Sequence, residues 1–150
     1  MLFDTDVLIW CFRGVAKAAL AIEKDPSPTI SVITYMELVQ GARDKKELKT
    51  ISSFLKDLRI PILPLSENIG HRASIYMEEH ALKNGMAMAD SLIAATATEL
   101  SLVLCTGNAK YFKVINDLSL LVFRPLFAGL KNQNRFPYGT PMETIAFNPR

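Results

Sequence analysis

Short runs of apolar residues recur along the first 125 positions, and polar or turn-forming residues bound each run. Their length and their content of leucine and β-branched side chains are typical of buried strands, which we predict at 1–3, 29–32, 60–65, 102–105 and 120–123. The stretches between them carry apolar residues at helical spacing, as at Leu48, Ile51, Leu55 and Leu58. The pattern predicts strands that alternate with helices, with one helix between the first two strands.

Strands separated by helices favour an α/β fold, and we expect a three-layer α/β/α sandwich with a central parallel sheet. Pro61 and Pro64 trim the third strand and indicate that it lies at a sheet edge. Ser66 is expected to cap the helix that follows, and Gly85 to end it. The alanine-rich helix predicted at 87–100 should pack closely against another element, because its side chains are small.

The periodic pattern stops near residue 125 of the 150-residue chain. A chain of this length fits one hydrophobic core. We therefore predict one domain at 1–125 and an irregular C-terminal tail at 126–150, where prolines, glycines and asparagines are scattered without a period.

Charge and cysteine content narrow the classes of function. Lys and Arg total 17 against 15 Asp and Glu, and the net charge of +2 permits a nucleic-acid site without indicating one. Cys11 and Cys105 form no C-x-x-C pair, so we expect buried thiols in a reducing compartment and no structural zinc site. No signal peptide is evident and no apolar run reaches about 18 residues. We expect a cytoplasmic protein with no membrane contact.

Three carboxylates follow predicted strands or begin predicted helices. Asp4 closes the first strand, Glu37 lies in the first turns of the helix after the second, and Asp90 begins the alanine-rich helix. In a parallel sheet all three can meet beyond the carboxyl ends of the strands, where Asn108 also falls. Clustered carboxylates repel one another unless a cation neutralises them, and Mg²⁺ or Mn²⁺ prefers such oxygen ligands. The cluster therefore indicates a site for a divalent metal.

Each acid also has a purely structural interpretation. Asp4 or Asp6 could cap the first helix, and Asp90 could be favoured by a helix dipole. Thr34-x-x-Glu37 matches a capping box, in which Glu37 would bond back to the Thr34 amide. Three acids at one predicted sheet edge are less easily explained in this way than any one of them alone.

Four segments resemble the signature motifs of PIN domains, in the same order and with similar spacing. They are LFDTDVLI at 2–9, YMELVQG at 35–41, ADSLIAATA at 89–97 and CTGNAKYF at 105–112. The resemblance covers about residues 1–125 and is strongest to the VapC-type toxins of bacterial and archaeal toxin–antitoxin pairs. It implies a PIN-like nuclease domain at 1–125.

The resemblance implies an endoribonuclease that depends on Mg²⁺ or Mn²⁺, hydrolyses RNA phosphodiester bonds and acts as the toxin of a type II toxin–antitoxin pair. It implies metal ligation by Asp4, Glu37 and Asp90, with Glu37 positioning or deprotonating the attacking water. Asn108 stands where the family often has an acid, and its amide can still hold a metal-bound water. Thr106 would orient the site through its hydroxyl, and Asp6 would be an additional outer ligand.

The partners implied by the resemblance are an RNA substrate, a cognate antitoxin that reaches into the site, and a second copy of the chain in a homodimer. The apolar stripe of Ile51, Leu55 and Leu58 could serve a dimer interface or the core. Basic residues that flank the motifs are candidates for phosphate contacts or ordinary solvated helix faces; they are Arg13, Arg43 and Lys110, with Lys45, Lys46, Lys49 and Lys113.

Two other functions fit parts of the sequence. Asp4-Thr5-Asp6 after a strand resembles the nucleophile motif of haloacid-dehalogenase-like phosphatases, in which Asp4 would attack phosphorus. That family needs a late acidic pair, whereas the acids after Asp90, Glu99 and Asp117, are wrongly placed. Asn108 in place of an acid is also compatible with a catalytically silent PIN-like binding module.

Overall fold

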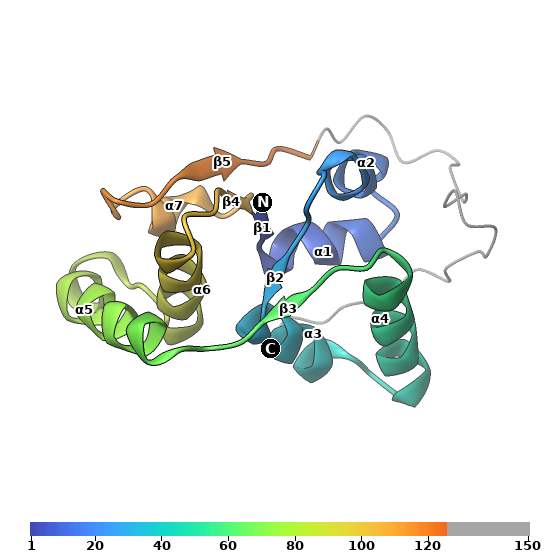
Figure 1. The fold of residues 1–150 in the computed structure, drawn as a ribbon, viewed down its shortest axis with the longest axis horizontal. Coiled ribbons are helices and arrows are strands. Elements are labelled where there is room, and N and C mark those ends of the chain that lie inside the picture. Colours follow the sequence, from blue (N-terminus) through green and yellow to red (C-terminus); the bar gives the residue numbers. More distant parts are fainter. Residues whose placement is uncertain (126–150) are drawn as a thin grey trace.

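The computed structural model of the chain describes residues 1–125, which form five strands and seven helices (Figure 1). The strands are β1 (Leu2–Phe3), β2 (Ile30–Ser31), β3 (Ile62–Leu63), β4 (Leu104–Thr106) and β5 (Leu120–Val122). The helices are α1 (Thr5–Phe12), α2 (Ala16–Lys24), α3 (Val32–Gly41), α4 (Lys45–Asp57), α5 (Glu67–Asn84), α6 (Met88–Glu99) and α7 (Ala109–Phe112). The predicted tail at 126–150 lies outside the described residues.

All paired strands of this part of the chain run parallel, as the alternation of strands and helices predicted. β4 pairs with β1 and with β5, and β2 pairs with β3. The two groups are joined beside β1, where the Phe3 amide donates to the Thr29 carbonyl over 2.9 Å and a parallel bridge links Leu2 to Thr29. The resulting order is β3-β2-β1-β4-β5. β3 therefore lies at an edge, as its flanking prolines indicated.

Helices cover both faces of the sheet. Successive strand residues point to opposite faces, so each face has apolar side chains to bury. Phe3 and Cys105 pack into a core with α1, α2, α3 and α4, whereas Leu2 and Leu104 pack into a second core with α5, α6 and α7. In Figure 1, α5 and α6 lie on one side of β1 and α1 and α4 on the other. The three-layer α/β/α arrangement is confirmed.

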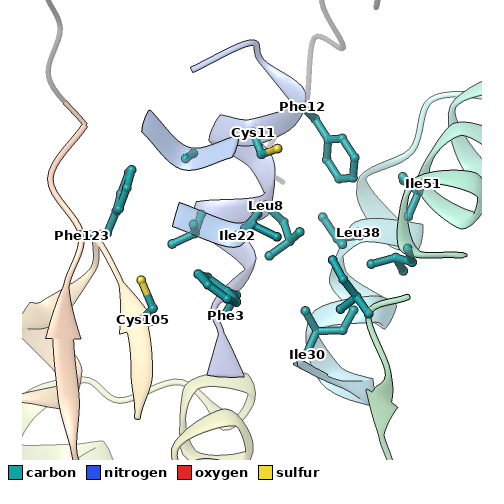
Figure 2. Close-up of a cluster of buried hydrophobic side chains, with 14 residues drawn as sticks. Phe3, Leu8, Cys11, Phe12, Ile22, Ile30, Leu38, Ile51, Cys105 and Phe123 are labelled. Atoms are coloured by element: carbon teal, nitrogen blue, oxygen red, sulfur yellow. The ribbon is translucent and has the colours of Figure 1, made fainter. Parts of the chain in front are cut away.

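The core between the sheet and the first four helices is built from large side chains (Figure 2). Phe3, Phe12, Ile22 and Leu38 converge there from four elements, and Ile51 of α4 closes the cluster. Ile51 and Leu55 are only 1% and 4% exposed, so these two members of the apolar stripe serve the core. The alternative of a dimer surface on that stripe is thereby disfavoured.

The two cysteines are buried free thiols, as predicted. Cys11 lies in α1 and Cys105 in β4, and both belong to the core shown in Figure 2. Burial raises the pKa of Cys11 to about 12 and of Cys105 to about 11. Both therefore stay neutral near pH 7 and act as small apolar side chains.

The single helix expected between the first two strands is two helices, and that prediction is wrong. α1 ends at Phe12 because Gly14 takes a φ of +81°, a backbone conformation that glycine adopts at little cost. The Gly14 amide donates to the Cys11 carbonyl and the Val15 amide to the Trp10 carbonyl. The chain turns there and α2 begins in a new direction.

Other helix ends follow the sequence signals. The Ser66 side chain accepts from the Ile69 amide at the start of α5, and Gly85 ends that helix with a φ of +70°. Ala94 and Ala97 of α6 are fully buried in a cluster with Ile69 and Ala73 of α5, so the predicted close packing of the alanine-rich helix is confirmed. No helix within residues 1–125 is long and apolar enough to cross a membrane.

Candidate active site

Asp4 leaves β1 and caps α1, so its carboxylate lies at the carboxyl end of the central strand. Its Oδ1 accepts from the Thr5 amide over 2.7 Å, and its Oδ2 accepts from the Thr106 hydroxyl over 2.6 Å. Thr106 ends β4, the neighbouring strand. Burial, followed by the charge of Asp6, raises the pKa of Asp4 to about 7. The capping interpretation is confirmed, and the same carboxylate also belongs to an acidic cluster.

Asp6 lies in the first turn of α1 and points toward the turn after β4. Its Oδ2 accepts from the Gly107 amide over 2.9 Å. Its Oδ1 is buried and has no hydrogen-bond partner among residues 1–125. Burial is the main reason that the pKa of Asp6 is raised to about 6, and the charge of Asp90 adds to it. The charged form of a carboxylate with one unpartnered buried oxygen is costly in free energy unless a positive group lies beside that oxygen.

Gly107 is required by the close packing around Asp6. A Cβ atom at this position would lie 2.2 Å from Cη2 of Trp10 and 3.0 Å from Oδ2 of Asp6. Trp10 is itself held by Phe123, with ring centroids 5.4 Å apart. In the sequence, Gly107 is only one residue of the CTGNAKYF segment at 105–112. Its position between two motif residues was a signal, but the contact with Trp10 is visible only in the structure.

Glu37 lies in α3 and faces the start of α1. Its Oε2 accepts a hydrogen bond from the Thr5 hydroxyl. The capping box that Thr34-x-x-Glu37 suggested is not formed, because Ser31 caps the helix and its hydroxyl accepts from the Thr34 amide over 3.0 Å. Because the Thr34 amide is already bonded to Ser31, the Glu37 side chain does not turn back to it. Glu37 accepts from Thr5 instead and lies in the acidic cluster. Thr5 is a residue that the sequence analysis missed in this role.

Asp90, in the first turn of α6, is the fourth acid of the cluster. The cap residue of that helix, Ala87, offers no side-chain acceptor, and its backbone hydrogen bond to Asp90 lowers the pKa of that carboxyl. Burial and then the charge of Glu37 raise the pKa of Asp90. The charge of Asp90 in turn contributes to the raised pKa of both Asp4 and Asp6. The fold thus brings carboxylates from α1, α3 and α6 into one electrostatic neighbourhood.

Asn108 and Thr106 are linked by the backbone of the turn. The Asn108 amide donates to the Thr106 hydroxyl over 3.0 Å, and that hydroxyl donates to Asp4. The Asn108 side chain is exposed, and it makes no capping hydrogen bond to α7. Thr106 is therefore fixed from both sides, by the Asp4 carboxylate and by the Asn108 amide.

The donors of this cluster are all oxygen atoms, which suit Mg²⁺ or Mn²⁺ better than zinc. Within residues 1–125, no group of three or more His, Cys, Asp or Glu side chains is placed so that it could hold a metal ion. Both oxygens of Asp4 accept from Thr5 and Thr106, and Glu37 accepts from Thr5. The unpartnered Oδ1 of Asp6 and the raised pKa values of three acids are nevertheless what a cation would relieve, so the chemistry of these donors, though not their present spacing, suits a divalent ion.

The basic residues singled out in the sequence differ in their surroundings. Arg13 is exposed directly after α1. Arg43 forms an ion pair with Glu47, with 2.7 Å between Nε and Oε1, and this pair holds the start of α4. Lys110 lies in α7 with its Nζ 5.3 Å from the centre of the Tyr111 ring. Arg43 is thus already engaged by a neighbouring carboxylate, while Lys110 lies beside the turn that carries Asn108.

Residues 1–118 match the PIN domain. The chain belongs to the PIN-domain family. A curated relative of this PIN-domain chain is Ribonuclease VapC10 of Mycobacterium tuberculosis, which is 34% identical over 122 residues. The alignment covers 79% of this chain and 90% of that protein.

Solved structures share the PIN fold of this chain. A toxin–antitoxin complex from Klebsiella pneumoniae contains a chain that is 31% identical, with a TM-score of 0.68 and coverage of 81% of this chain and 95% of that chain. FitAcB from Neisseria gonorrhoeae is 27% identical, with a TM-score of 0.60 and coverage of 83% and 96%. These matches favour the PIN-domain interpretation over the haloacid-dehalogenase-like alternative.

Proposed function

We propose that this PIN-domain protein is a metal-dependent endoribonuclease and the toxin of a type II toxin–antitoxin pair. The observation that carries the proposal is the cluster of Asp4, Asp6, Glu37 and Asp90 at the carboxyl ends of the central strands. A relative named as a ribonuclease, and a fold shared with a toxin–antitoxin complex, support the same assignment.

Asp4 and Asp90 would hold the metal directly, and Glu37 would act on the attacking water. Mg²⁺ or Mn²⁺ is the expected ion because all of these ligands are hard oxygens. When bound, such an ion offsets charge on a phosphate and makes nearby water more acidic. This role explains why the fold keeps the buried Asp4 near three partly buried acids despite their repulsion.

The side chains around the acids have distinct tasks in this proposal. The Thr106 hydroxyl fixes Oδ2 of Asp4, and the Thr5 hydroxyl holds Oε2 of Glu37. Glu37 would accept a proton from water as the new oxygen–phosphorus bond forms, and the leaving ribose oxygen would take a proton from solvent water as its bond to phosphorus breaks. Asn108 offers an amide that can hold a water beside Thr106.

RNA binding is assigned to basic residues near the site. Arg13 and Lys110 are exposed, and Lys110 lies close to the turn that carries Asn108. Arg43 belongs to the same predicted set, although its ion pair with Glu47 must compete with phosphate. A cognate antitoxin would inhibit the enzyme, and the toxin would form a homodimer through a surface other than the buried Ile51 and Leu55 of α4.

The direct test is cleavage of a mixed RNA substrate by the purified chain with Mg²⁺ or Mn²⁺, with EDTA, and after Asp4→Ala or Asp90→Ala. Cleavage by the wild-type chain alone, and only with metal, supports the proposal. Asp57→Asn is the matched control, since Asp57 ends α4 and is exposed. Absence of cleavage by the wild-type chain supports a silent binding module instead, and full activity of either site variant overturns the ligand assignment.

A further inference from the structure

Two aromatic side chains, Trp10 and Phe123, pack together at the edge of the sheet where β4 ends. The Phe123 amide donates to the Thr106 carbonyl over 2.7 Å, which fixes Phe123 beside that strand end. The ring centroids are 5.4 Å apart and the ring planes are tilted by 33°. Phe123 is buried, whereas Trp10 is only half-buried among the described residues. Part of the indole surface is therefore left without protein contacts in this part of the chain.

The indole ring lies directly beside the turn that follows β4. A Cβ atom on Gly107 would be 2.2 Å from Cη2 and 2.5 Å from Cζ3 of Trp10, so only glycine lets the ring lie this close. The Gly107 amide donates to Oδ2 of Asp6 over 2.9 Å. One residue thus separates the rim of the indole from the active site. Phe123 and Gly107 together fix the ring, and an aromatic surface held in this way is preorganised for a ligand.

Basic side chains lie around the aromatic pair. Lys17 is exposed, and its Nζ lies 5.6 Å from the centre of the Phe123 ring and donates to the Arg124 carbonyl over 2.7 Å. The Arg124 side chain is exposed, and so is that of Arg13, which follows Trp10 by three residues at the end of α1. Residues at this spacing are neighbours on a helix. Aromatic rings flanked by cations are typical of surfaces that bind single-stranded nucleic acid, where bases stack and phosphates contact the cations.

Charge favours contact through a base at the indole itself. Asp6 is adjacent to Trp10 across Gly107, and its carboxylate repels a phosphate placed there. A nucleobase is uncharged, so it can lie on the indole without this repulsion. Lys17, on the other side of the pair, is available to a phosphate of the same strand.

We propose that Trp10 is a substrate-binding residue on which a base of single-stranded RNA stacks, next to the bond that is cut, while Lys17 contacts the backbone of the same strand. This inference rests on the proposed function and deepens it, because it assigns a base-binding position beside the active site. Every base has an aromatic face, so this contact holds the strand in place without reading its sequence.

The first test uses the fact that Trp10 is the single tryptophan of the chain. Indole emission of the full-length Asp90→Ala variant is followed in EDTA, so that RNA is bound but not cut, while a mixed-sequence single-stranded oligoribonucleotide is added. We expect saturable quenching, because a stacked base is in direct contact with the indole. An abasic strand of the same length should bind through its phosphates and leave the emission unchanged. Equal emission changes with both strands, or no change with RNA that binds, overturn the inference.

The second test measures RNA affinity by fluorescence anisotropy with a labelled strand in the same background. Trp10→Leu should raise the dissociation constant about 5- to 100-fold, and Trp10→Phe should recover part of the loss because a smaller ring remains. Phe54→Leu is the matched control, since Phe54 is also half-buried and packs on Phe12 with ring centroids 4.9 Å apart. If Trp10→Leu and Phe54→Leu change the affinity equally, Trp10 has only a packing role.

Salt dependence separates the base contact from the phosphate contact. Stacking releases no counterions, so Trp10→Leu should weaken binding at every salt concentration and leave the slope of log affinity against log salt concentration unchanged. Lys17→Gln should reduce that slope by about 1. A reduced slope in Trp10→Leu contradicts a contact through a base.

Failure of this inference can be distinguished from failure of the proposed function. If the wild-type chain neither binds nor cleaves RNA, both fail. If it cleaves RNA with Mn²⁺ but the indole is not quenched and Trp10→Leu, folded as judged by circular dichroism, binds RNA normally, only the stacking role of Trp10 is refuted. The quenching measurement needs no change at Trp10, so it decides the question even where Trp10→Leu fails to fold.

Discussion

The Thr106 hydroxyl donates a hydrogen bond to Oδ2 of Asp4 over 2.6 Å, although the two residues are 102 positions apart in sequence. The same hydroxyl accepts from the Asn108 amide. Parallel pairing of β1 with β4 places the two strand ends side by side, so the contact follows directly from the sheet. This bond connects the turn that carries Gly107 and Asn108 to a carboxylate assigned to the metal.

Replacement of Thr106 by valine keeps the shape of the side chain and removes that bond. We expect cleavage activity to fall about 10- to 100-fold, as for other residues that orient a metal ligand. Because the bond lowers the pKa of Asp4, its loss should raise that pKa further and shift the acid limb of the kcat/KM profile to higher pH. Thr50→Val, which removes only an exposed hydroxyl bonded to the Lys46 carbonyl, is the control. An unchanged pH profile would argue that Thr106 is merely structural.

The stability of the metal-free protein should depend on pH through Asp4 and Asp6, whose pKa values are raised from 3.8 to about 7 and about 6. The folded chain then keeps protons that the unfolded chain releases. The free energy of unfolding should therefore fall as pH rises from about 4 to about 7, by about 1.4 kcal/mol per pH unit for each such proton. Urea unfolding in EDTA across this range measures the slope.

Two comparisons isolate the contribution of these acids to the pH dependence. Asp6→Asn should flatten the slope, because the variant lacks one of the two groups. Mn²⁺ should offset the loss of stability at the upper end of the range, since it binds the deprotonated carboxylates. If wild type and Asp6→Asn show the same slope, the raised pKa of Asp6 is refuted.

A pair of glycine substitutions tests the packing behind the site. Gly107→Ala should destabilise the fold by about 1–3 kcal/mol, because the new Cβ would meet the Trp10 ring at 2.2 Å. Gly70→Ala lies inside α5 with nothing within 4 Å of its Cβ, and it should stabilise the protein by about 0.5–1 kcal/mol. Urea unfolding of both variants gives the two values. Equal effects would show that the contact with Trp10 does not constrain position 107.

RNA affinity should depend on salt through the basic residues near the active site. In an inactive Asp90→Ala background, Lys110→Gln should weaken RNA binding and reduce the slope of log affinity against log salt concentration by about 1. Lys24→Gln, at the exposed end of α2, should leave the slope unchanged. Fluorescence anisotropy with a labelled single-stranded RNA gives both slopes. An unaltered slope for Lys110→Gln removes this residue from the RNA-binding surface.

Much of the fold could be predicted from local patterns. Pro61 and Pro64 lack amide donors, so they indicated an edge strand, and β3 is at the edge. Ser66 and Gly85 act through bonds to residues within one turn, and both helix ends lie where predicted. The position of Asp4 at the end of a buried strand followed from the apolar run before it. Each of these features depends on neighbours in sequence.

The details of the site were decided by tertiary structure. Thr34 and Glu37 match a capping box, but Ser31 takes the Thr34 amide and Glu37 bonds to Thr5 across the sheet edge. The packing of α3 against α1 brings Glu37 beside Thr5 and so selects this bond over the capping box. The local sequence is compatible with either hydrogen bond of Glu37 and does not show which one forms.

Asp6 and Gly107 show most clearly which features follow from local sequence and which depend on tertiary contacts. Which residues carry charge and which can turn follows from the sequence, and the hydrophobic pattern around them predicts that they lie at strand ends. Only the parallel register of β1 and β4 brought the two residues together, left one oxygen of Asp6 unpartnered and set Trp10 against the glycine. Hydrophobic periodicity acts over a few residues, whereas these contacts join positions about 100 residues apart, and their geometry exists only once the sheet has formed.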